Sequence, residues 1–365
     1  MTIKQKVLFI GKLNTQAEIY KQFHRTFECI HYQISSKEEL IQDFQTNLAD
    51  VEAIYGGWGG FDSVGGFNGE VLEFCPPALK IVAICSIGYD GYDVNGMRKK
   101  GITLTNVPSM IASEAVADLV LYNTISSFRN FKFFENNFKD KYTNTGVLRT
   151  SLVHSKFDSF NGQPIIKPIT GHSFAHSACG REILSPRGHN AVIVGFGSIG
   201  KLIGQRLSSI GMNVHYIKRS KMSDSEASQL GYEATYHASL SEVNDIVDLL
   251  IIACPGSAQT KHMINETTIN AISKPFRIIN IGRGYIIDER ALIEGLRSSK
   301  ILFAGLDVFE YEPVVNPDLI GRQDVVLTPH IGSSTTENFN YTMCTAMENI
   351  KTVLLNIDGD ITRVN

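Results

Sequence analysis

The chain has 365 residues, of which 43% are hydrophobic and 19% charged, and its formal net charge is −3 at pH 7. This length favours two globular domains, each able to bury its own core. The small negative charge argues against a general binder of nucleic acid or of an anionic membrane surface. No apolar run approaches the length of a membrane span, and no secretory signal precedes the first predicted strand.

The six cysteines stand at irregular spacing and form no CxxC pair. Four of them lie in or beside apolar stretches, where reduced cysteines pack as small hydrophobic residues. This pattern favours a reducing compartment over disulfides or a metal site. We therefore expect a cytoplasmic protein that holds no metal ion.

The first part of the chain alternates between strand-like and helix-like segments. Strands are expected at 7–10, 29–34, 53–55, 81–85 and 102–105, and helices at 17–27 and 38–44. Short strands separated by helical patterns predict a parallel sheet with helices on its faces. Trp58, in a glycine-rich turn after the third strand, is expected either to shape a substrate pocket or to pack on the surface.

The middle of the chain contains a long apolar segment and then an irregular one. Residues 109–128 predict a buried helix that crosses from one domain to the next. Residues 140–189 are polar and rich in turn residues, and a loop of this length is uncommon in a compact domain. We expect a functional or poorly ordered insertion. Its histidines, His154, His172 and His176, lack acids or cysteines at ligand spacing and are expected to be solvated.

From residue 191 the alternation resumes. Strands are expected at 191–194, 214–217, 246–253, 277–281, 302–306 and 325–327, and helices at 201–209, 290–298 and 335–355. We therefore predict an α/β protein with two doubly wound parallel-sheet domains that flank a cleft. Residues 108–333 would form a Rossmann-type cofactor domain, and residues 1–107 with 334–365 a flavodoxin-like substrate domain.

A glycine pattern follows the strand at 191–194 and opens a helix. The pattern alone is weak, but this position is typical of a dinucleotide site, where a tight turn and a helix N-terminus hold the pyrophosphate. The predicted contacts are Gly195, Phe196, Gly197, Ser198, Ile199 and Gly200.

The end of the next strand indicates which dinucleotide is bound. A carboxylate there would bind the ribose 2′-hydroxyl and disfavour a 2′-phosphate. The chain has Lys218, Arg219 and Ser220 instead. Two cations and a hydroxyl favour NADP(H) over NAD(H), and a solvated basic turn is the alternative.

Three separated residues, Arg283, Glu312 and His330, each follow a strand-like segment. Arginine can bind a substrate carboxylate and polarise a keto oxygen. Histidine can donate a proton, and a carboxylate behind it stabilises the imidazolium form. With a hydride donor beside them, these side chains have the chemistry to reduce a 2-keto acid.

With these motifs, the chain resembles the D-isomer-specific 2-hydroxyacid dehydrogenase family over nearly its whole length. The resemblance is sharpest at 192–200, 278–288, 305–313 and 327–332. The segment at 185–190 and the insertion before it are most similar to the fungal branch that includes D-mandelate dehydrogenase. The resemblance implies a small 2-keto acid substrate and a homodimer, with the insertion lying where family members often build a dimer arm.

The resemblance also implies individual roles. Glu312 would pair with His330, and Glu310 would be a solvated neighbour. Asp307 would lie near the nicotinamide carboxamide, or would simply end a strand. The backbone N–H groups of Ile87 and Gly88 would hold the substrate carboxylate. Four residues would line the cofactor cleft: Cys254, Pro255, Ile281 and Gly282.

A second function remains open at this point. Corepressors of the C-terminal-binding-protein type resemble the same family, retain the same three residues and sense a dinucleotide. A dinucleotide-sensing interaction protein is therefore the alternative to an enzyme.

Overall fold

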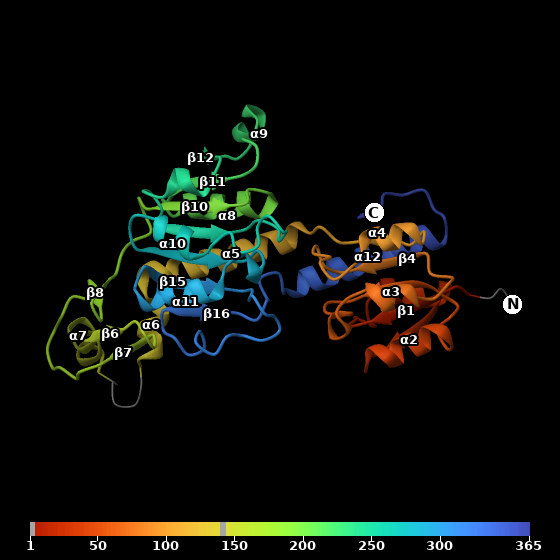
Figure 1. Ribbon diagram of the computed structural model, residues 1–365, viewed down its shortest axis with the longest axis horizontal. Coiled ribbons are helices and arrows are strands. Elements are labelled where there is room, and N and C mark those ends of the chain that lie inside the picture. Colours follow the sequence, from red (N-terminus) through yellow and green to blue (C-terminus); the bar gives the residue numbers. More distant parts are fainter. Residues whose placement is uncertain (1–3, 139–143) are drawn as a thin grey trace. The chain divides into compact units, whose positions relative to one another are not determined.

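The computed structural model describes residues 4–138 and 144–365 and divides into two compact units (Figure 1). Unit 1 consists of Met1–Ile111 and Ser334–Asn365, and unit 2 of Ala112–Ser333. Each unit is built on a sheet whose strands all pair in parallel. The predicted α/β class with two doubly wound parallel sheets is confirmed.

Unit 1 has the strand order β2-β1-β3-β4-β5, which is the flavodoxin-like order. The strands are β1 (Lys6–Ile10), β2 (Glu28–Tyr32), β3 (Val51–Gly56), β4 (Ile81–Ile84) and β5 (Thr103–Thr105). Helices α1 (Glu18–Thr26) and α12 (Thr336–Leu354) cover one face. Helices α2 (Lys37–Gln45), α3 (Gly69–Glu73) and α4 (Val94–Lys99) cover the other, beside the short η1 (Asp62–Val64).

Unit 2 has the order β12-β11-β10-β13-β14-β15-β16, the Rossmann order with one further strand at an edge. The strands are β10 (Asn190–Val194), β11 (Asn213–Ile217), β12 (Ala234–His237), β13 (Leu249–Ile252), β14 (Phe276–Asn280), β15 (Ile301–Leu306) and β16 (Val325–Leu327). The strand predicted at 246–253 is shorter than expected, and β12 was not predicted. The order of strands reverses between β10 and β13, which is where such sheets bind their ligands.

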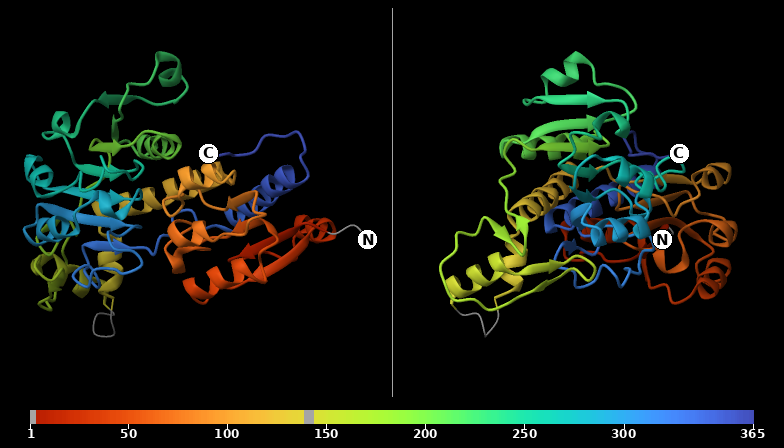
Figure 2. Two further views of the ribbon diagram at one scale, coloured as in Figure 1. Left: turned by 45° about the vertical axis from the view of Figure 1, so that its right-hand side comes forward. Right: turned by 60° about the vertical axis from the view of Figure 1, so that its left-hand side comes forward.

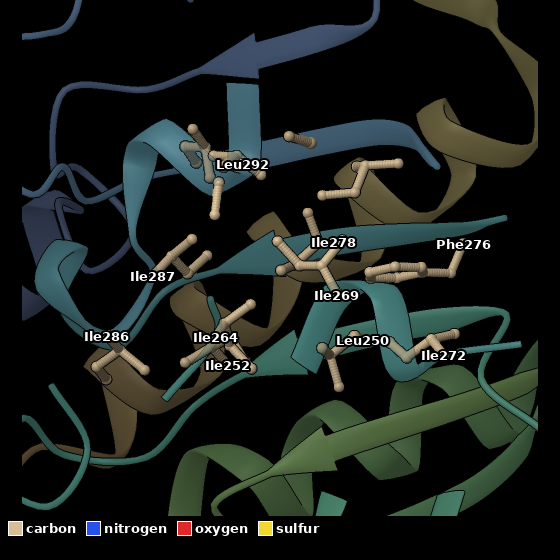
Figure 3. Packing of buried hydrophobic residues seen from close by; sticks show 14 of the residues in the cluster. Leu250, Ile252, Ile264, Ile269, Ile272, Phe276, Ile278, Ile286, Ile287 and Leu292 are labelled. Atoms are coloured by element: carbon tan, nitrogen blue, oxygen red, sulfur yellow. The ribbon is translucent and has the colours of Figure 1, made fainter. Parts of the chain in front are cut away.

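Helices cover both faces of the unit 2 sheet. Helices α5 (Met110–Arg129) and α8 (Ser198–Ser209) pack on one face. The short helix α9 (Asp224–Ser228) follows β11 in the chain. Helices α10 (Glu266–Ala271) and α11 (Glu289–Arg297) pack on the other, near η3 (Leu240–Val243) and η4 (Gly284–Ile286). Figure 3 shows Ile269 and Leu292 from these helices facing Leu250 and Ile278 from the strands.

An arm formed by residues 131–138 and 144–182 lies beside this sheet (Figure 2). It contains α6 (Phe131–Asn136), α7 (Thr145–His154) and two antiparallel pairs, β6 (Lys156–Asp158) with β7 (Gln163–Ile165) and β8 (Ser177–Ala178) with β9 (Arg181–Glu182). Five buried residues form its own core: Phe133, Leu148, Leu152, Ala178 and Cys179. The segment predicted to be irregular at 140–189 therefore contains a helix and two strand pairs between 144 and 182, whereas 183–189 form no helix or strand. Residues 140–143 lie outside the described residues.

A buried ion network fastens the arm to the sheet. Asp324 accepts hydrogen bonds from Arg322 at 3.0 Å and from Arg181 at 3.2 Å. Arg322 also donates to the carbonyl oxygens of Ser159 and Phe160. Because buried charges must be paired and hydrogen-bonded, this network sets where the arm can lie.

Two features are missing from the residues that the structure describes, a helix able to span a membrane and a cluster able to bind a metal ion. None of their helices combines the length and apolar character that crossing a membrane requires. They contain no group of three or more side chains placed to hold a metal ion.

Candidate active site

The candidate catalytic residues of unit 2 follow neighbouring strands at one edge of the sheet. Arg283 follows β14, Glu312 follows β15 and His330 follows β16. Because these strands are parallel and adjacent, their carboxyl ends lie together. The structure places Glu312 and His330 in direct contact, and the charge of Arg283 acts electrostatically on both.

Glu312 and His330 form an imidazole–carboxylate pair. Nδ1 of His330 lies 3.0 Å from Oε2 of Glu312, and Oε1 of Glu312 accepts the N–H of Phe309 at 2.9 Å. Burial tends to raise the pKa of Glu312, but the hydrogen bonds from His330 and Phe309 outweigh it, so this pKa lies below its usual value. The hydrogen bond that His330 donates to the Glu312 carboxylate raises the pKa of His330 despite partial burial. Both shifts favour the charged pair, imidazolium with carboxylate.

The turn that carries Arg283 is shaped by buried Asn280. The Asn280 side chain donates to the carbonyl oxygen of Arg283 at 3.0 Å and accepts the N–H of Gly282 at 3.1 Å. A Cβ atom on Gly284 would lie 1.8 Å from the backbone of Phe309. Only glycine fits there, and this close approach brings the Arg283 turn against the loop that holds Glu312.

Asp307 holds the loop that presents His330. Oδ1 of Asp307 accepts the Thr328 hydroxyl at 2.7 Å and the Ile331 N–H at 2.9 Å, and Oδ2 accepts the Gly332 N–H at 2.8 Å. His330 itself has φ +54°, in the left-handed region that costs an L-residue energy. These three hydrogen bonds, one from a residue before His330 and two from residues after it, stabilise that conformation. The predicted contact of Asp307 with the nicotinamide stays a prediction.

Glu310 is not the solvated neighbour that we predicted. Its side chain is only 7% exposed, and its Oε1 lies 2.6 Å from Nε2 of His262. Its Oε2 accepts the Glu289 N–H at 2.9 Å, and Oε1 of Glu289 accepts the Glu310 N–H at 2.8 Å. No local pattern indicated this role, because both partners are distant in sequence. For Asn280 the sequence did contain a signal of a structural role, because it is a polar residue inside the apolar run at 278–281.

The glycine-rich turn after β10 fits a dinucleotide pyrophosphate. Gly195 has φ +95°, and a Cβ there would lie 2.5 Å from the backbone nitrogen of Cys254. A Cβ on Gly200 would lie 2.3 Å from the Gly195 oxygen, whereas one on Gly197 would meet open space. α8 begins at Ser198, so its first N–H groups face that space. The turn therefore has room for an anion where a helix N-terminus attracts one.

The side chains of the predicted cofactor residues take different positions. The ring of Phe196 is buried and stacks on Tyr216 at 4.3 Å, so only its backbone can serve a cofactor. Ile199, Cys254 and Ile281 are half-buried and pack against the core clusters of unit 2, and Gly282 is buried, while Pro255 is exposed. A Cβ on Gly256 would lie 2.8 Å from Cγ of Arg283, so the 254–256 turn adjoins the Arg283 turn.

The basic turn after β11 is open to solvent. Lys218 is half-buried, and Arg219 and Ser220 are exposed. A carboxylate does lie on α9, where Glu226 accepts the Ser223 N–H at 3.1 Å and pairs with Lys201 at 3.3 Å.

In unit 1, Ile87 and Gly88 lie in the turn after β4. The Gly88 oxygen accepts the Ser86 hydroxyl at 2.7 Å, and the Ile87 oxygen accepts the Asn106 side chain at 2.8 Å. These bonds fix the peptide planes of the turn, and the contact of its N–H groups with a substrate carboxylate stays a prediction. Trp58, in the turn after β3, is 43% exposed.

The doubly wound sheet and its glycine turn are typical of a dinucleotide-binding unit. The family model described as "D-isomer specific 2-hydroxyacid dehydrogenase, NAD binding domain" matches residues 169–332. A "Putative 2-hydroxyacid dehydrogenase" of Saccharomyces cerevisiae is 31% identical over 387 residues, covering 97% of this chain and 95% of the relative.

Two solved structures are similar over nearly the whole chain. The holo form of D-mandelate dehydrogenase from Rhodotorula graminis has a TM-score of 0.82 at 26% identity, covering 96% of this chain and 94% of that one. The NADPH-dependent glyoxylate/hydroxypyruvate reductase of Sinorhizobium meliloti, in complex with NADP and malonate, has a TM-score of 0.74 at 27% identity, covering 99% and 97%.

The chain belongs to the D-isomer specific 2-hydroxyacid dehydrogenase family, in its fungal branch. The predicted family is confirmed. The protein is an oxidoreductase that acts on a CH–OH group and uses a nicotinamide dinucleotide.

The Glu312 contact should control the proton on His330. In Glu312→Gln the charged partner is lost, so we expect the pKa of His330 to fall by about one unit or more. An NMR titration of the histidine ring protons measures this change. The other histidines should titrate as in the wild-type protein, and an unchanged pKa of His330 would contradict the pairing.

Proposed function

We propose that the protein reduces a small 2-keto acid to the D-2-hydroxy acid, with NADPH favoured over NADH, and catalyses the reverse oxidation. The observation that carries this proposal is the Glu312–His330 pair beside Arg283, at the same sheet edge as the glycine-rich turn. Relatives with similar structures act on both small and aromatic acids, so the keto acid itself is a matter for experiment.

His330 is the proton donor in this reaction. Its Nδ1 faces Glu312, so Nε2 is the ring atom that can give a proton to the substrate keto oxygen. Glu312 keeps the imidazole protonated and oriented until that transfer. Bound NADPH supplies the hydride that reduces the keto carbon. In the oxidation direction the neutral ring of His330 takes up the hydroxyl proton.

Arg283 binds the substrate carboxylate and polarises the keto oxygen. A guanidinium can make two parallel hydrogen bonds to a carboxylate, and its charge stabilises the negative charge that grows on the oxygen. The backbone N–H groups of Ile87 and Gly88, in the unit 1 turn after β4, are further proposed donors to a substrate carboxylate. Asp307 and Asn280 keep the His330 and Arg283 turns in place.

His330→Ala and Arg283→Ala should each lower kcat/KM by about 10²–10⁴-fold, because each removes a group that acts on the reacting atoms. NADPH binding should be unchanged. Absorbance of the reduced nicotinamide, followed across small, branched and aromatic 2-keto acids, measures the turnover. His24→Ala, at an exposed position on α1, is the control. Tight NADPH binding without turnover of any acid would refute the reaction and favour a dinucleotide-sensing protein.

The preference for NADPH rests on Lys218, Arg219 and Ser220, which follow β11. This place would carry a carboxylate if the ribose 2′-hydroxyl were to be bound. Glu226 does not supply that carboxylate, because its oxygens are already engaged by Ser223 and Lys201. Two cations beside a hydroxyl suit a 2′-phosphate.

Lys218→Asp should shift the preference towards NADH, by about tenfold or more in the ratio of the two kcat/KM values, because a phosphate partner is replaced by a like charge. Kinetics with both cofactors measures the ratio. Lys221→Asp, three residues further on and exposed, is the matched control. An unchanged ratio in Lys218→Asp would remove the phosphate site.

The protein works as a cytoplasmic homodimer that pairs through the arm. Several aromatic side chains of the arm are more than half exposed: Phe131, Phe138, Phe160 and Phe174. Large exposed apolar side chains that recur along one segment of the chain favour an interface between proteins. All six cysteines are unpaired, in keeping with a reducing compartment.

The double substitution Phe160→Glu with Phe174→Glu should convert the dimer to a monomer, because it puts charges into an apolar interface. Sedimentation velocity measures the mass. Phe74→Glu, in unit 1, exchanges another exposed phenylalanine and should leave the dimer intact. A wild-type protein that sediments as a monomer would disprove the dimer.

A further inference from the structure

Unit 2 contains a second imidazole–carboxylate pair, His262 with Glu310, that the proposed reaction does not use. The two side chains meet at 2.6 Å, and the carboxylate is 7% exposed. His262 has φ +49°, a conformation that an L-residue adopts only where its surroundings stabilise it. A buried carboxylate and a strained backbone each cost free energy, so their occurrence at one contact indicates that the contact serves a function.

The His262 segment is bound to the residues that follow Arg283. The His262 N–H donates to the Tyr285 oxygen at 2.9 Å. The Ile264 N–H donates to the Ile286 oxygen at 3.1 Å, and the Ile264 oxygen accepts the Asp288 N–H at 2.9 Å. His262 is therefore held in register with the Arg283 turn, and it lies a few residues after the 254–256 turn.

Glu310 is bound to the start of α11. The carboxylates of Glu310 and Glu289 each accept the backbone N–H of the other residue, at 2.9 and 2.8 Å. Glu289 belongs to the same stretch that follows Arg283. Both oxygens of Glu310 are thus engaged, one by His262 and one by Glu289, and the loop after β15 is tied to two other segments at this single side chain.

This anchor lies next to the catalytic carboxylate. Glu310 is two residues before Glu312, and the residue on its other side, Phe309, donates its N–H to Glu312. A shift of Glu310 would move Phe309 and Glu312 together. The bond between Glu312 and His330 then depends on the contact between Glu310 and His262.

We propose that His262 and Glu310 are positioning residues, which hold Glu312 in place and through it maintain the proton on His330. This inference rests on the proposed function. Three groups contact the Glu310 carboxylate, namely the His262 ring, the Glu289 N–H and the Tyr311 hydroxyl, and Asp288 acts electrostatically on that tyrosine. Three charged groups face His330: Glu312, Asp307 and Arg283.

The pH dependence of keto acid reduction tests this inference. His330 must carry a proton, so the rate falls as the pH rises through the pKa of His330. In Glu310→Ala the looser Glu312 stabilises the imidazolium less, and this alkaline limb should move to lower pH by about one unit. His262→Ala should move it in the same direction. NADPH binding should change little.

Glu310→Gln separates positioning from charge. Glutamine keeps an oxygen for the Glu289 N–H and offers its amide N–H to a neutral His262 ring, so both ties can persist. Because both ties persist, we expect an alkaline limb within about 0.3 unit of the wild-type value. For comparison, a shift of one unit corresponds to about 1.4 kcal/mol. Glu242→Ala, which breaks the remote contact with His237 at 3.8 Å, is the control.

An NMR titration of His330 in the same variants measures its pKa without turnover. Absence of turnover in the wild-type protein would reject the proposed reaction, whereas the pKa would still decide the positioning role. Positioning is overturned if Glu310→Ala and His262→Ala leave the pKa of His330 at its wild-type value. It is also overturned if Glu310→Gln lowers that pKa as much as Glu310→Ala, since charge alone would then explain the effect.

Discussion

The contact on which the site depends is the approach of two backbones, at Gly284 and Phe309. No side chain fits between them, so the turn after β14 and the loop after β15 keep one separation. Arg283 is the residue beside the first backbone, and the second donates its N–H to Glu312. The guanidinium and the carboxylate are therefore placed by main-chain packing, which varies less than side-chain packing when single residues change.

Three acids within one short segment have different tasks because they differ in how far their side chains are buried. Asp307 and Glu310 are largely buried, and their oxygens accept N–H groups from other segments. Glu312 is 37% exposed at its side chain and faces an imidazole that can gain and lose a proton. Buried carboxylates with fixed donors stabilise geometry, whereas a more open one can respond when the charge of its partner changes.

Much of this arrangement follows from local sequence. Apolar runs bounded by glycines predicted most strands within a few residues, and Arg283, Glu312 and His330 stood out because each follows such a run. The edge strand β12 was missed because Ala-Thr-Tyr-His lacks an apolar pattern and is stabilised by pairing with β11. The hairpins of the arm and the burial of Glu310 were missed for a related reason. Their stability comes from partners far away in sequence, such as Asp324 and His262.

The residues proposed to act on the reacting atoms all belong to one compact unit, whereas two further proposed donors to the substrate belong to the other. Arg283, Glu312 and His330 lie in unit 2, and the turn with Ile87 and Gly88 lies in unit 1. The hydrogen bonds that hold Glu312, the His330 loop and the Arg283 turn in place are made within unit 2. A substitution in the unit 1 turn replaces no partner in these bonds, so the geometry of the imidazole–carboxylate pair is inherited separately from that turn.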